Sequence, residues 1–274
     1  MTTQKRIFVT GGASGFGRAL AERWAKDGYR VCIGDINDAR LEETLGSLRK
    51  LGATAHALRC DVTSEADLQA AAAWLSESWG GVDIVVNNAG VAISGSITEI
   101  SMDDWRWIVD INLLGVVRGC KVFTPLFQKQ GGGRFVNVSS MAGLIHPPMM
   151  SAYNATKAAV VALSETLAVE LAHDKIEVSV VCPSFFRTNL TETMRAGSPD
   201  IAAITNKLVN KAKHGADEIA ELTFKGVKRG DFHILTHADG RAAWMLKRLA
   251  PFSVYVKAVK KNTARMMGKS QRKL

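Results

Sequence analysis

Short runs of apolar residues, several of them rich in β-branched side chains, recur along the chain between Lys5 and Cys182. Each run has the length of a strand and leads into a turn or an amphipathic stretch, which is the pattern of strands buried on both faces of a parallel sheet. The predicted strands span residues 5–10, 30–34, 54–59, 82–86, 135–138 and 177–182.

Longer stretches with apolar residues at helical spacing separate these strands. The predicted helices follow Gly17 and span residues 39–50, 64–79, 103–129 and 151–173. Strands that alternate with helices of this length form βαβ units, so we expect an α/β fold in which a doubly wound parallel sheet carries helices on both faces. Because no internal repeat or low-complexity linker interrupts this alternation, a single-domain, three-layer sandwich is the predicted architecture.

The composition of the 274-residue chain is that of an ordinary globular protein, with 47% hydrophobic and 22% charged residues. The first residues contain no apolar run typical of a signal peptide, and polar residues interrupt the longest apolar region, 108–127. We therefore expect a cytoplasmic protein without a membrane span. The cysteines form no Cys-x-x-Cys or Cys/His cluster, which predicts reduced thiols and no metal site; they are Cys32, Cys60, Cys120 and Cys182.

The net charge of +9 is concentrated at the end of the chain. From Arg241 to Leu274 there are ten basic residues and no acidic one, which leaves 25 basic against 26 acidic residues in the rest. The high isoelectric point is therefore a property of this basic extension, 241–274, and the body of the protein has no charge that would favour nucleic acid.

A glycine-rich turn, T-G-G-A-S-G-F-G at residues 10–17, connects the first predicted strand to the first helix. Glycines allow a ligand to approach the backbone closely, and the free N–H groups and dipole of a helix start attract a pyrophosphate. The spacing, with Gly11, Gly15 and Gly17, differs from the general G-x-G-x-x-G fingerprint of dinucleotide-binding proteins. By itself the cluster could also be a tight turn.

Asp35, at the end of the second predicted strand, adds a second feature of a dinucleotide site. A carboxylate at this position accepts hydrogen bonds from the adenosine ribose hydroxyls and repels a 2′-phosphate. The nearest cation, Arg40, falls inside the next predicted helix. The sequence therefore favours NAD over NADP as the cofactor.

The stretch from Ser139 to Lys157 holds candidate catalytic groups. Tyr153 and Lys157 are four residues apart, so on a helix they stand on one face, and Ser140 ends the preceding strand. A lysine ammonium near a phenol favours phenolate, so we expect Lys157 to lower the pKa of Tyr153 for proton transfer with an alcohol or ketone. On these residues alone, an ordinary amphipathic pair on a surface helix remains the alternative.

Taken in order, these motifs resemble the short-chain dehydrogenase/reductase family, in its one-domain branch with a Tyr-x-x-x-Lys active site. The resemblance covers about residues 5–240 and implies a Rossmann-type NAD(P)-binding catalytic domain at 1–240. The residues that carry it are Thr10, Gly11, Gly15, Gly17, Asp61, Val62, Asn87, Asn88, Ala89, Gly90, Asn112, Ser140, Tyr153, Lys157 and the segment 183–188.

The resemblance also implies a role for each matching position. Tyr153 would be the acid/base, Ser140 would hydrogen-bond the substrate oxygen, and Asn112 would anchor a proton-relaying water. Lys157 would in addition hold the nicotinamide ribose. Ser139 would bond nearby backbone or cofactor. The implied cofactor-binding residues are Gly11, Ser14, Gly15, Phe16, Gly17, Asp35, Ile36, Asp61, Val62, Asn88, Ala89, Gly90, Tyr153, Lys157, Pro183, Phe186 and Thr188.

The substrate side of the chain is the family's variable lid, expected here at about 184–213. One departure from the family pattern lies at its start, where Ser184 follows Pro183 in place of the usual glycine. The apolar composition around the lid predicts a hydrophobic or aromatic secondary alcohol or ketone. The predicted substrate residues are Ile93, Leu144, His146, Met149, Phe185, Leu190 and Met194.

The expected function is NAD-dependent hydride transfer between nicotinamide and such an alcohol or ketone. The alternatives are an NADP-dependent 3-oxoacyl-type reductase and a non-catalytic nucleotide-sensing or scaffold protein. The family implies a homo-tetramer or homo-dimer. We interpret the extension 241–274 as a docked amphipathic helix followed by a frayed end from about Gly268, with membrane, partner or subunit contact as alternatives.

Overall fold

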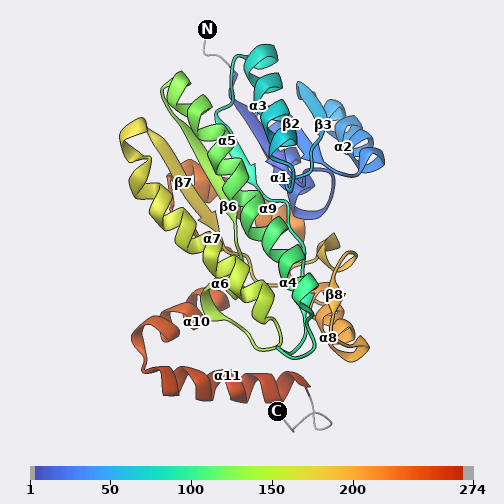
Figure 1. Ribbon diagram of the computed structural model, residues 1–274, viewed down its shortest axis with the longest axis vertical. Coiled ribbons are helices and arrows are strands. Elements are labelled where there is room, and N and C mark those ends of the chain that lie inside the picture. The colour runs from blue at the N-terminus through green and yellow to red at the C-terminus, as the bar shows by residue number, and fades with distance from the viewer. Residues whose placement is uncertain (1–3, 268–274) are drawn as a thin grey trace.

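The computed structural model describes residues 4–267, without the side chains of residues 191 and 262–267. Its centre is a seven-stranded sheet in which every pair of neighbours is parallel, in the order β3-β2-β1-β4-β6-β7-β9 (Figure 1). The strands are β1 (Arg6–Thr10), β2 (Arg30–Asp35), β3 (Ala55–Arg59), β4 (Ile84–Asn87), β6 (Gly133–Val138), β7 (Ile176–Val181) and β9 (His233–Ile234).

The order of the strands reverses between β1 and β4, which pair with each other at the middle of the sheet. In open α/β sheets the crevice for ligands lies outside the carboxyl ends of the strands at such a reversal. The glycine turn after β1 and the residues after β4 therefore open onto one crevice. The predicted doubly wound α/β fold is confirmed.

Helices cover both faces of the sheet. Figure 1 shows α3 (Glu65–Trp79), α5 (Gly115–Gln130) and α7 (Ser151–Glu170) on the near side and α1 (Gly15–Lys26) and α9 (Ala216–Arg229) on the far side. Helix α2 (Asp38–Lys50) joins the core on the side of α1. The Trp24 ring packs edge-on to Phe224, with centroids 5.2 Å apart, so α1 and α9 share one hydrophobic layer.

The long predicted helix at 103–129 is interrupted in the structure. It consists of α4 (Met102–Val109), a π-helical segment (Asp110–Leu114) and α5. A π-helical turn holds one residue more than an α-helical turn and is frequent at functional sites. Here the inserted turn brings the Asn112 side chain, which is fully buried, to the backbone of Val91, where it accepts from N at 2.8 Å and donates to O at 2.9 Å.

One predicted boundary needs correction, and one strand was missed. The helix predicted at 151–173 ends at Glu170, after which a 3₁₀ turn (Ala172–Asp174) leads through left-handed Lys175 into β7. Strand β9 was not predicted because it has two residues, too few for a recognisable alternation of apolar and polar positions.

The lid region contains more regular structure than its sequence indicated. Strands β5 (Ile93–Ser94) and β8 (Arg195–Ala196) pair in a separate small sheet, which joins the lid to the segment after β4. A short 3₁₀ helix (Asn189–Thr191) precedes β8, and α8 (Pro199–Asn210), capped by Ser198, follows it.

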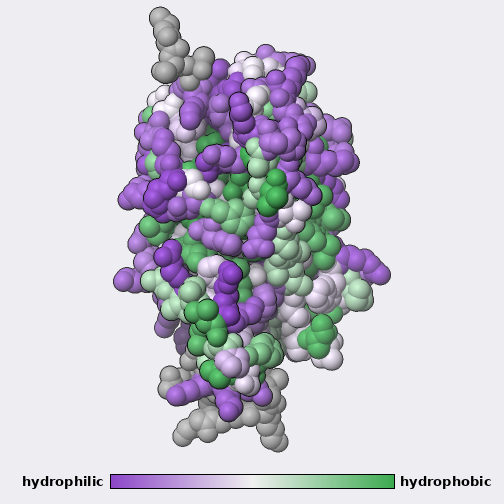
Figure 2. All heavy atoms as spheres, turned by 90° about the vertical axis from the view of Figure 1, so that its left-hand side faces the viewer, coloured by the Kyte–Doolittle hydropathy of each residue, from purple (hydrophilic) through white to green (hydrophobic). Residues whose placement is uncertain are grey.

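The basic extension forms two helices, α10 (Ala238–Leu249) and α11 (Phe252–Met267), at the lower end of the molecule in Figure 1. Pro251 separates them, because proline cannot continue a helix. Figure 2 shows hydrophobic and hydrophilic side chains next to one another at this end. The predicted frayed segment from Gly268 lies outside the described residues. Along the described chain, no helix combines the length and the apolar character that a bilayer crossing requires.

Candidate active site

The glycine turn after β1 has the geometry that the sequence predicted. Gly11 and Gly15 adopt φ angles of +63° and +51°, which L side chains rarely take. A Cβ at Gly17 would overlap the Gly11 carbonyl oxygen and the Asn88 amide, so this position tolerates only glycine. Within the described part of the chain, no side chain caps the start of α1 and its first turn has no acid. The free N–H groups there fit an anion such as a pyrophosphate.

Asp35 lies at the carboxyl end of β2, beside the glycine turn. Its carboxylate accepts hydrogen bonds from Ala13 N at 3.2 Å and from Asn37 N at 3.1 Å, which hold it in place. The cation closest to it along the next helix, Arg40, pairs with Glu192 of the lid at 2.7 Å. Ile36, which follows Asp35, is 57% exposed and borders the same edge.

The residues after β4 are held by a side chain that the sequence analysis did not single out for this purpose. Thr10 Oγ1 accepts from Asn88 N at 3.0 Å and from Ala89 N at 3.2 Å, and the Asn88 amide donates to Thr10 O at 2.9 Å. A Cβ at Gly11 would lie 2.9 Å from the Ala89 Cα. These contacts hold the ends of β1 and β4 together.

Asp61 and Val62 follow β3 at the same edge of the sheet. The Asp61 carboxylate accepts from Thr63 N at 2.8 Å and from Thr63 Oγ1 at 2.7 Å, so it stabilises its own turn. Val62 is buried against Gly115 of α5. Both residues therefore lie just after the carboxyl end of β3, and their contact with the adenine stays a prediction.

Tyr153 and Lys157 lie one turn apart on α7, both buried, with exposed fractions of 8% and 4%. The Lys157 ammonium donates to Val138 O at 3.0 Å and lies 5.8 Å from the centre of the Tyr153 ring. Ser140 follows β6, whose last residue is Val138, so the sheet itself positions the hydroxyl beside the phenol. The structure brings these three of the four predicted catalytic side chains to one cavity; the fourth is Asn112, whose place is described above.

The pKa of Tyr153 is raised in this structure, whereas the sequence predicted that it would be lowered. Burial raises the pKa of Tyr153 to about 12, against a smaller opposing effect of its hydrogen bond with Ser140. Burial also lowers the pKa of Lys157 to about 8. The reason is desolvation: both groups lie in a low-dielectric site, which disfavours the charged form of each, and the ammonium is turned toward a backbone carbonyl.

The two adjacent serines have different surroundings, as predicted. Ser139 Oγ is buried and donates to Lys157 O at 2.7 Å. This bond holds the turn of α7 that carries Tyr153 and Lys157 against the end of β6. Ser140 Oγ accepts from Ala142 N at 3.1 Å and donates to Pro183 O at 3.3 Å. Both serines border the cavity, but the hydrogen bonds of Ser140 are longer than that of Ser139, so Ser140 is the hydroxyl that a substrate can recruit more easily.

The loop after β7 also borders the crevice. The Pro183 carbonyl accepts from Met141 N at 2.8 Å, and Ser184 N donates to His237 Nδ1 at 3.2 Å. His237, buried just before α10, was not predicted as part of the site, because its contact crosses 53 positions of the sequence. Phe186 packs edge-on to Phe16 of α1 at 5.3 Å, and Thr188 contacts Gly15, so the lid starts directly over the glycine turn.

A cavity of about 520 Å³ lies above Ser140, Tyr153 and Lys157. Phe185 and Leu190 border it as predicted, whereas Ile93, Leu144, His146, Met149 and Met194 do not. Ile93 and Leu144 are buried in neighbouring clusters, and the His146 ring is bonded to Ala142 O. The other apolar walls are Val91, Ile145, Pro147, Pro148, Met150 and Val209, which lie in the segments expected to form the pocket, and Ala243, Leu246, Tyr255, Ala258 and Val259, which were not predicted.

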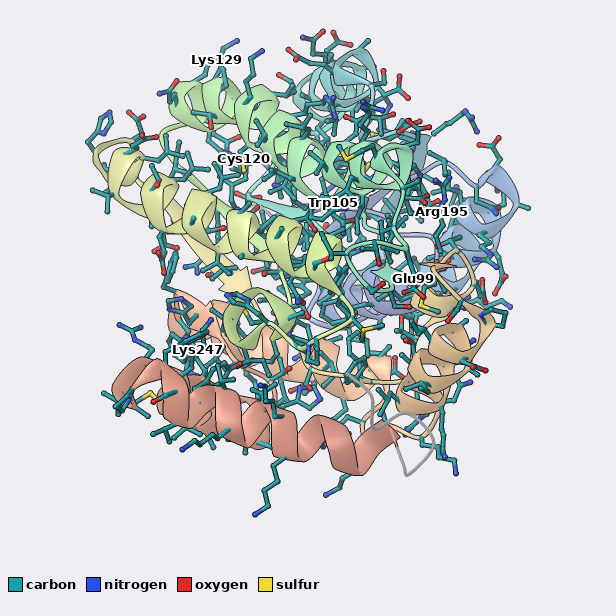
Figure 3. The ribbon with its side chains drawn as sticks, turned by 60° about the horizontal axis from the view of Figure 1, so that its bottom comes forward. Glu99, Trp105, Cys120, Lys129, Arg195 and Lys247 are labelled. Carbon is teal, nitrogen blue, oxygen red and sulfur yellow. The ribbon has the colours of Figure 1, made fainter. Side chains whose placement is uncertain are left out.

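Residues of α10 and α11 are therefore part of the cavity wall. Lys247, which lies between α6 (Ala142–Ile145) and α11 in Figure 3, donates to Leu144 O at 2.6 Å. The Tyr255 hydroxyl donates to Ile145 O. Both bonds end on the short helix between Ser140 and Tyr153, so the basic extension is anchored on the active-site loop. In the described residues, no cluster of His, Cys, Asp and Glu could hold a metal ion.

Comparison with known proteins decides the family. A family model described as short chain dehydrogenase matches residues 5–199. The chain belongs to the short-chain dehydrogenase/reductase family. It is 34% identical over 253 residues to a CLA biosynthesis dehydrogenase/reductase of Lactiplantibacillus plantarum, covering 86% of this chain and 88% of that one. It is 37% identical over 194 residues to a 3beta-hydroxysteroid dehydrogenase of Mediterraneibacter gnavus, covering 70% of each.

A solved structure agrees with this assignment. A short-chain dehydrogenase/reductase from Burkholderia phymatum, crystallised in complex with NAD, is 34% identical and superimposes with a TM-score of 0.85, covering 94% of this chain and 97% of that one. As a member of the short-chain dehydrogenase/reductase family, the protein is an oxidoreductase with a Rossmann-type fold. The match to the family model ends at residue 199, so the cavity wall supplied by α10 and α11 lies beyond it.

Proposed function

We propose that the protein is an NAD-dependent dehydrogenase or ketoreductase for apolar secondary alcohols or ketones. One observation carries this proposal: Ser140, Tyr153 and Lys157 converge at the floor of a mostly apolar cavity, beside the glycine turn. The cavity is bordered by a hydroxyl, a phenol and an ammonium. Together these groups suit proton exchange with a carbonyl or alcohol oxygen. A protein that only sensed or scaffolded a nucleotide would not need this combination.

The chain's own residues would bind, orient and protonate the substrate. A bound nicotinamide cofactor would supply or accept the hydride. Tyr153 would give its phenolic proton to the substrate oxygen during reduction and take it back during oxidation. Ser140 would turn its hydroxyl hydrogen from Pro183 O to the same substrate oxygen. The raised pKa of Tyr153 keeps the phenol protonated at neutral pH, which suits the donor role in reduction.

Lys157 and Asn112 would support this proton exchange. With its pKa at about 8, Lys157 is mostly an ammonium at neutral pH, and it would stabilise negative charge that develops on the Tyr153 oxygen during transfer. Asn112 lies close by, because a Cβ at Gly90 would be 3.1 Å from its amide oxygen and 3.5 Å from the Lys157 nitrogen. We propose that the remaining polar capacity of Asn112 holds a water that relays the proton.

The choice of NAD over NADP rests on Asp35. Its carboxylate is fixed by two backbone N–H groups at the carboxyl end of β2, where the adenosine ribose of a Rossmann-type site lies. A 2′-phosphate there would meet a negative charge, whereas a ribose hydroxyl would gain an acceptor. The Burkholderia phymatum relative in complex with NAD supports the same choice.

The preference for an apolar substrate rests on the walls of the cavity. Phe185, Leu190, Leu246 and Val259 face a space of about 520 Å³, which has the size of a small-molecule site. Relatives named for CLA biosynthesis and for 3beta-hydroxysteroids are consistent with an apolar substrate. We propose that residues 184–213 form the lid over this cavity. We also propose that the protein is cytoplasmic, where its free cysteines stay reduced. Finally, we propose that it forms a homo-oligomer through α5 and α7.

Fluorescence titration with NADH and NADPH, combined with assays on a panel of apolar ketones, tests the proposal. We expect tighter binding of NADH, turnover of apolar ketones, and loss of at least ~100-fold in turnover for Tyr153→Phe. Preference for NADPH together with turnover of 3-oxoacyl thioesters would instead indicate a 3-oxoacyl-type reductase. Cofactor binding without any turnover, in wild type and Y153F alike, would indicate a nucleotide-sensing protein.

A further inference from the structure

The outer surface of α10 and the start of α11 expose large apolar side chains next to one another. Met245 and Leu249 are four residues apart on α10 and are 44% and 77% exposed. Phe252 begins α11, three residues after Leu249, and is 72% exposed. Met245 and Leu249 therefore share one face of α10, and Phe252 follows at the junction with α11; we call these three exposed side chains the apolar corner. Nothing in the described chain covers it.

The outer surface of α11 carries positive charge. Lys257 and Lys261 are four residues apart and Lys260 stands beside them, all exposed. Arg241 and Arg248 of α10 are also exposed, on the side of Met245. No ion pair of the described residues involves any of the five. Beyond Asp239 the sequence contains no acidic residue that could neutralise this basic face.

The inner surfaces of the same helices are already occupied. Leu246, Tyr255, Ala258 and Val259 line the substrate cavity, and Lys247 is bonded to Leu144 O. The helices therefore have an inner side committed to the fold and an outer side that combines an apolar corner with a basic face. Figure 2 shows this mixture of hydrophobic and hydrophilic side chains at the lower end of the molecule.

We propose that this outer side docks on an anionic lipid bilayer. Helices that lie in a membrane interface combine basic residues with large apolar ones that enter the boundary between headgroups and acyl chains. Met245, Leu249 and Phe252 would enter this boundary, while the lysines of α11 contact lipid phosphates. Each basic residue near an anionic surface strengthens binding about fivefold, which corresponds to about 1 kcal/mol.

Charge separates this occupant from a second copy of the chain. In a symmetric dimer through this side, the basic face of one copy would meet the same basic face of its partner, because a two-fold interface uses one patch twice. Like charges would then be brought together without any acid to pair them. An anionic bilayer offers both complementary charge and an apolar phase. Docking would also bring the cavity wall formed by α10 and α11 close to a membrane in which apolar alcohols and ketones are concentrated.

Vesicle sedimentation of the full-length protein tests the proposal. We expect binding to vesicles that contain phosphatidylglycerol, little binding to phosphatidylcholine alone, and release by salt. Neutralising the basic face with Lys257→Gln, Lys260→Gln and Lys261→Gln should weaken binding about fivefold per residue, or about 100-fold together. Leu249→Ser with Phe252→Ser should weaken it at least ~10-fold.

A matched control removes the same charge elsewhere. Lys50, Lys129 and Lys211 are exposed and lie outside α10 and α11. Their triple glutamine variant has the same net charge as the basic-face variant, but it should bind vesicles like wild type. Equal binding to both vesicle types, or equal binding of the basic-face variant and its control, would overturn the proposal. Light scattering gives a second readout: if Leu249→Ser with Phe252→Ser converted an oligomer to a smaller species, the corner would belong to a subunit interface instead. NADH titration and thermal melts verify that each variant is folded.

Discussion

Replacing Lys157 with methionine should remove a pH-dependent part of the protein's stability. The ordinary pKa of lysine is 10.5, and burial lowers that of Lys157 to about 8. Below about pH 8 the side chain is an ammonium in the folded and the unfolded state, and the folded state carries the unfavourable desolvation. Methionine has a similar length and no charge, so Lys157→Met removes this titration.

The sign of the effect follows from which state binds more protons. Between about pH 8 and pH 10.5 the folded protein has released a proton that the unfolded chain still holds, so stability must rise with pH. The slope is about 1.4 kcal/mol per pH unit, and the full gain over this window is about 3 kcal/mol. Above pH 10.5 the lysine is neutral in both states and the gain is complete.

Urea unfolding at a fixed protein concentration, repeated from pH 7 to pH 10, measures this gain. The quantity to follow is the free energy of unfolding of wild type minus that of Lys157→Met, because other titrating groups largely cancel in the difference. We expect this difference to increase with pH. For Lys50→Met, which removes an exposed lysine, it should stay flat. A flat difference for Lys157→Met as well would show that the ammonium is not desolvated, and our account of both active-site pKa values would fail.

Three further predictions concern the cofactor site and the cavity. Gly17→Ala should weaken NADH binding at least ~10-fold in a fluorescence titration, because its Cβ would overlap the Gly11 carbonyl, whereas Gly46→Ala, which meets open space, should bind normally. Asp35→Ser should shift the ratio of NADPH to NADH affinity about tenfold toward NADPH, and an unchanged ratio would argue against the role of this carboxylate. Tyr255→Ala should raise KM for large apolar ketones relative to wild type while leaving kcat for small ones unchanged, and an unchanged KM for the large ketones would exclude Tyr255 from the substrate wall.

The parts of the site that could be predicted are those encoded by local spacing. Tyr153 and Lys157 are separated by one helical turn, and Gly11, Gly15 and Gly17 lie between the end of β1 and the first turn of α1. Each group is positioned by the element that contains it, so the order of strands and helices was enough to bring the groups to one edge of the sheet.

The parts that could not be predicted depend on contacts between distant positions. The bond from Lys247 to Leu144 spans 103 positions and that from Ser184 to His237 spans 53, and no local pattern announces either. For this reason the sequence indicated a docked helix at the end of the chain but not that it would line the cavity. The pKa of Tyr153 was misjudged for a related reason: spacing indicates a nearby lysine but not the depth of burial, which decides the direction of the shift.

The π-helical segment Asp110–Leu114 changes the rotation of α5 about the helix axis relative to α4. One residue advances an α-helix by about 100°. Deleting a single residue there would restore a regular helix and turn α5 by that angle, so that either Asn112 would leave Val91 or Phe123 and Phe127 would leave the core. With the extra residue, the same continuous helix can keep Asn112 at Val91 and Phe123 and Phe127 in the core. We therefore expect this stretch to tolerate changes of length poorly, whichever residues they leave around Asn112.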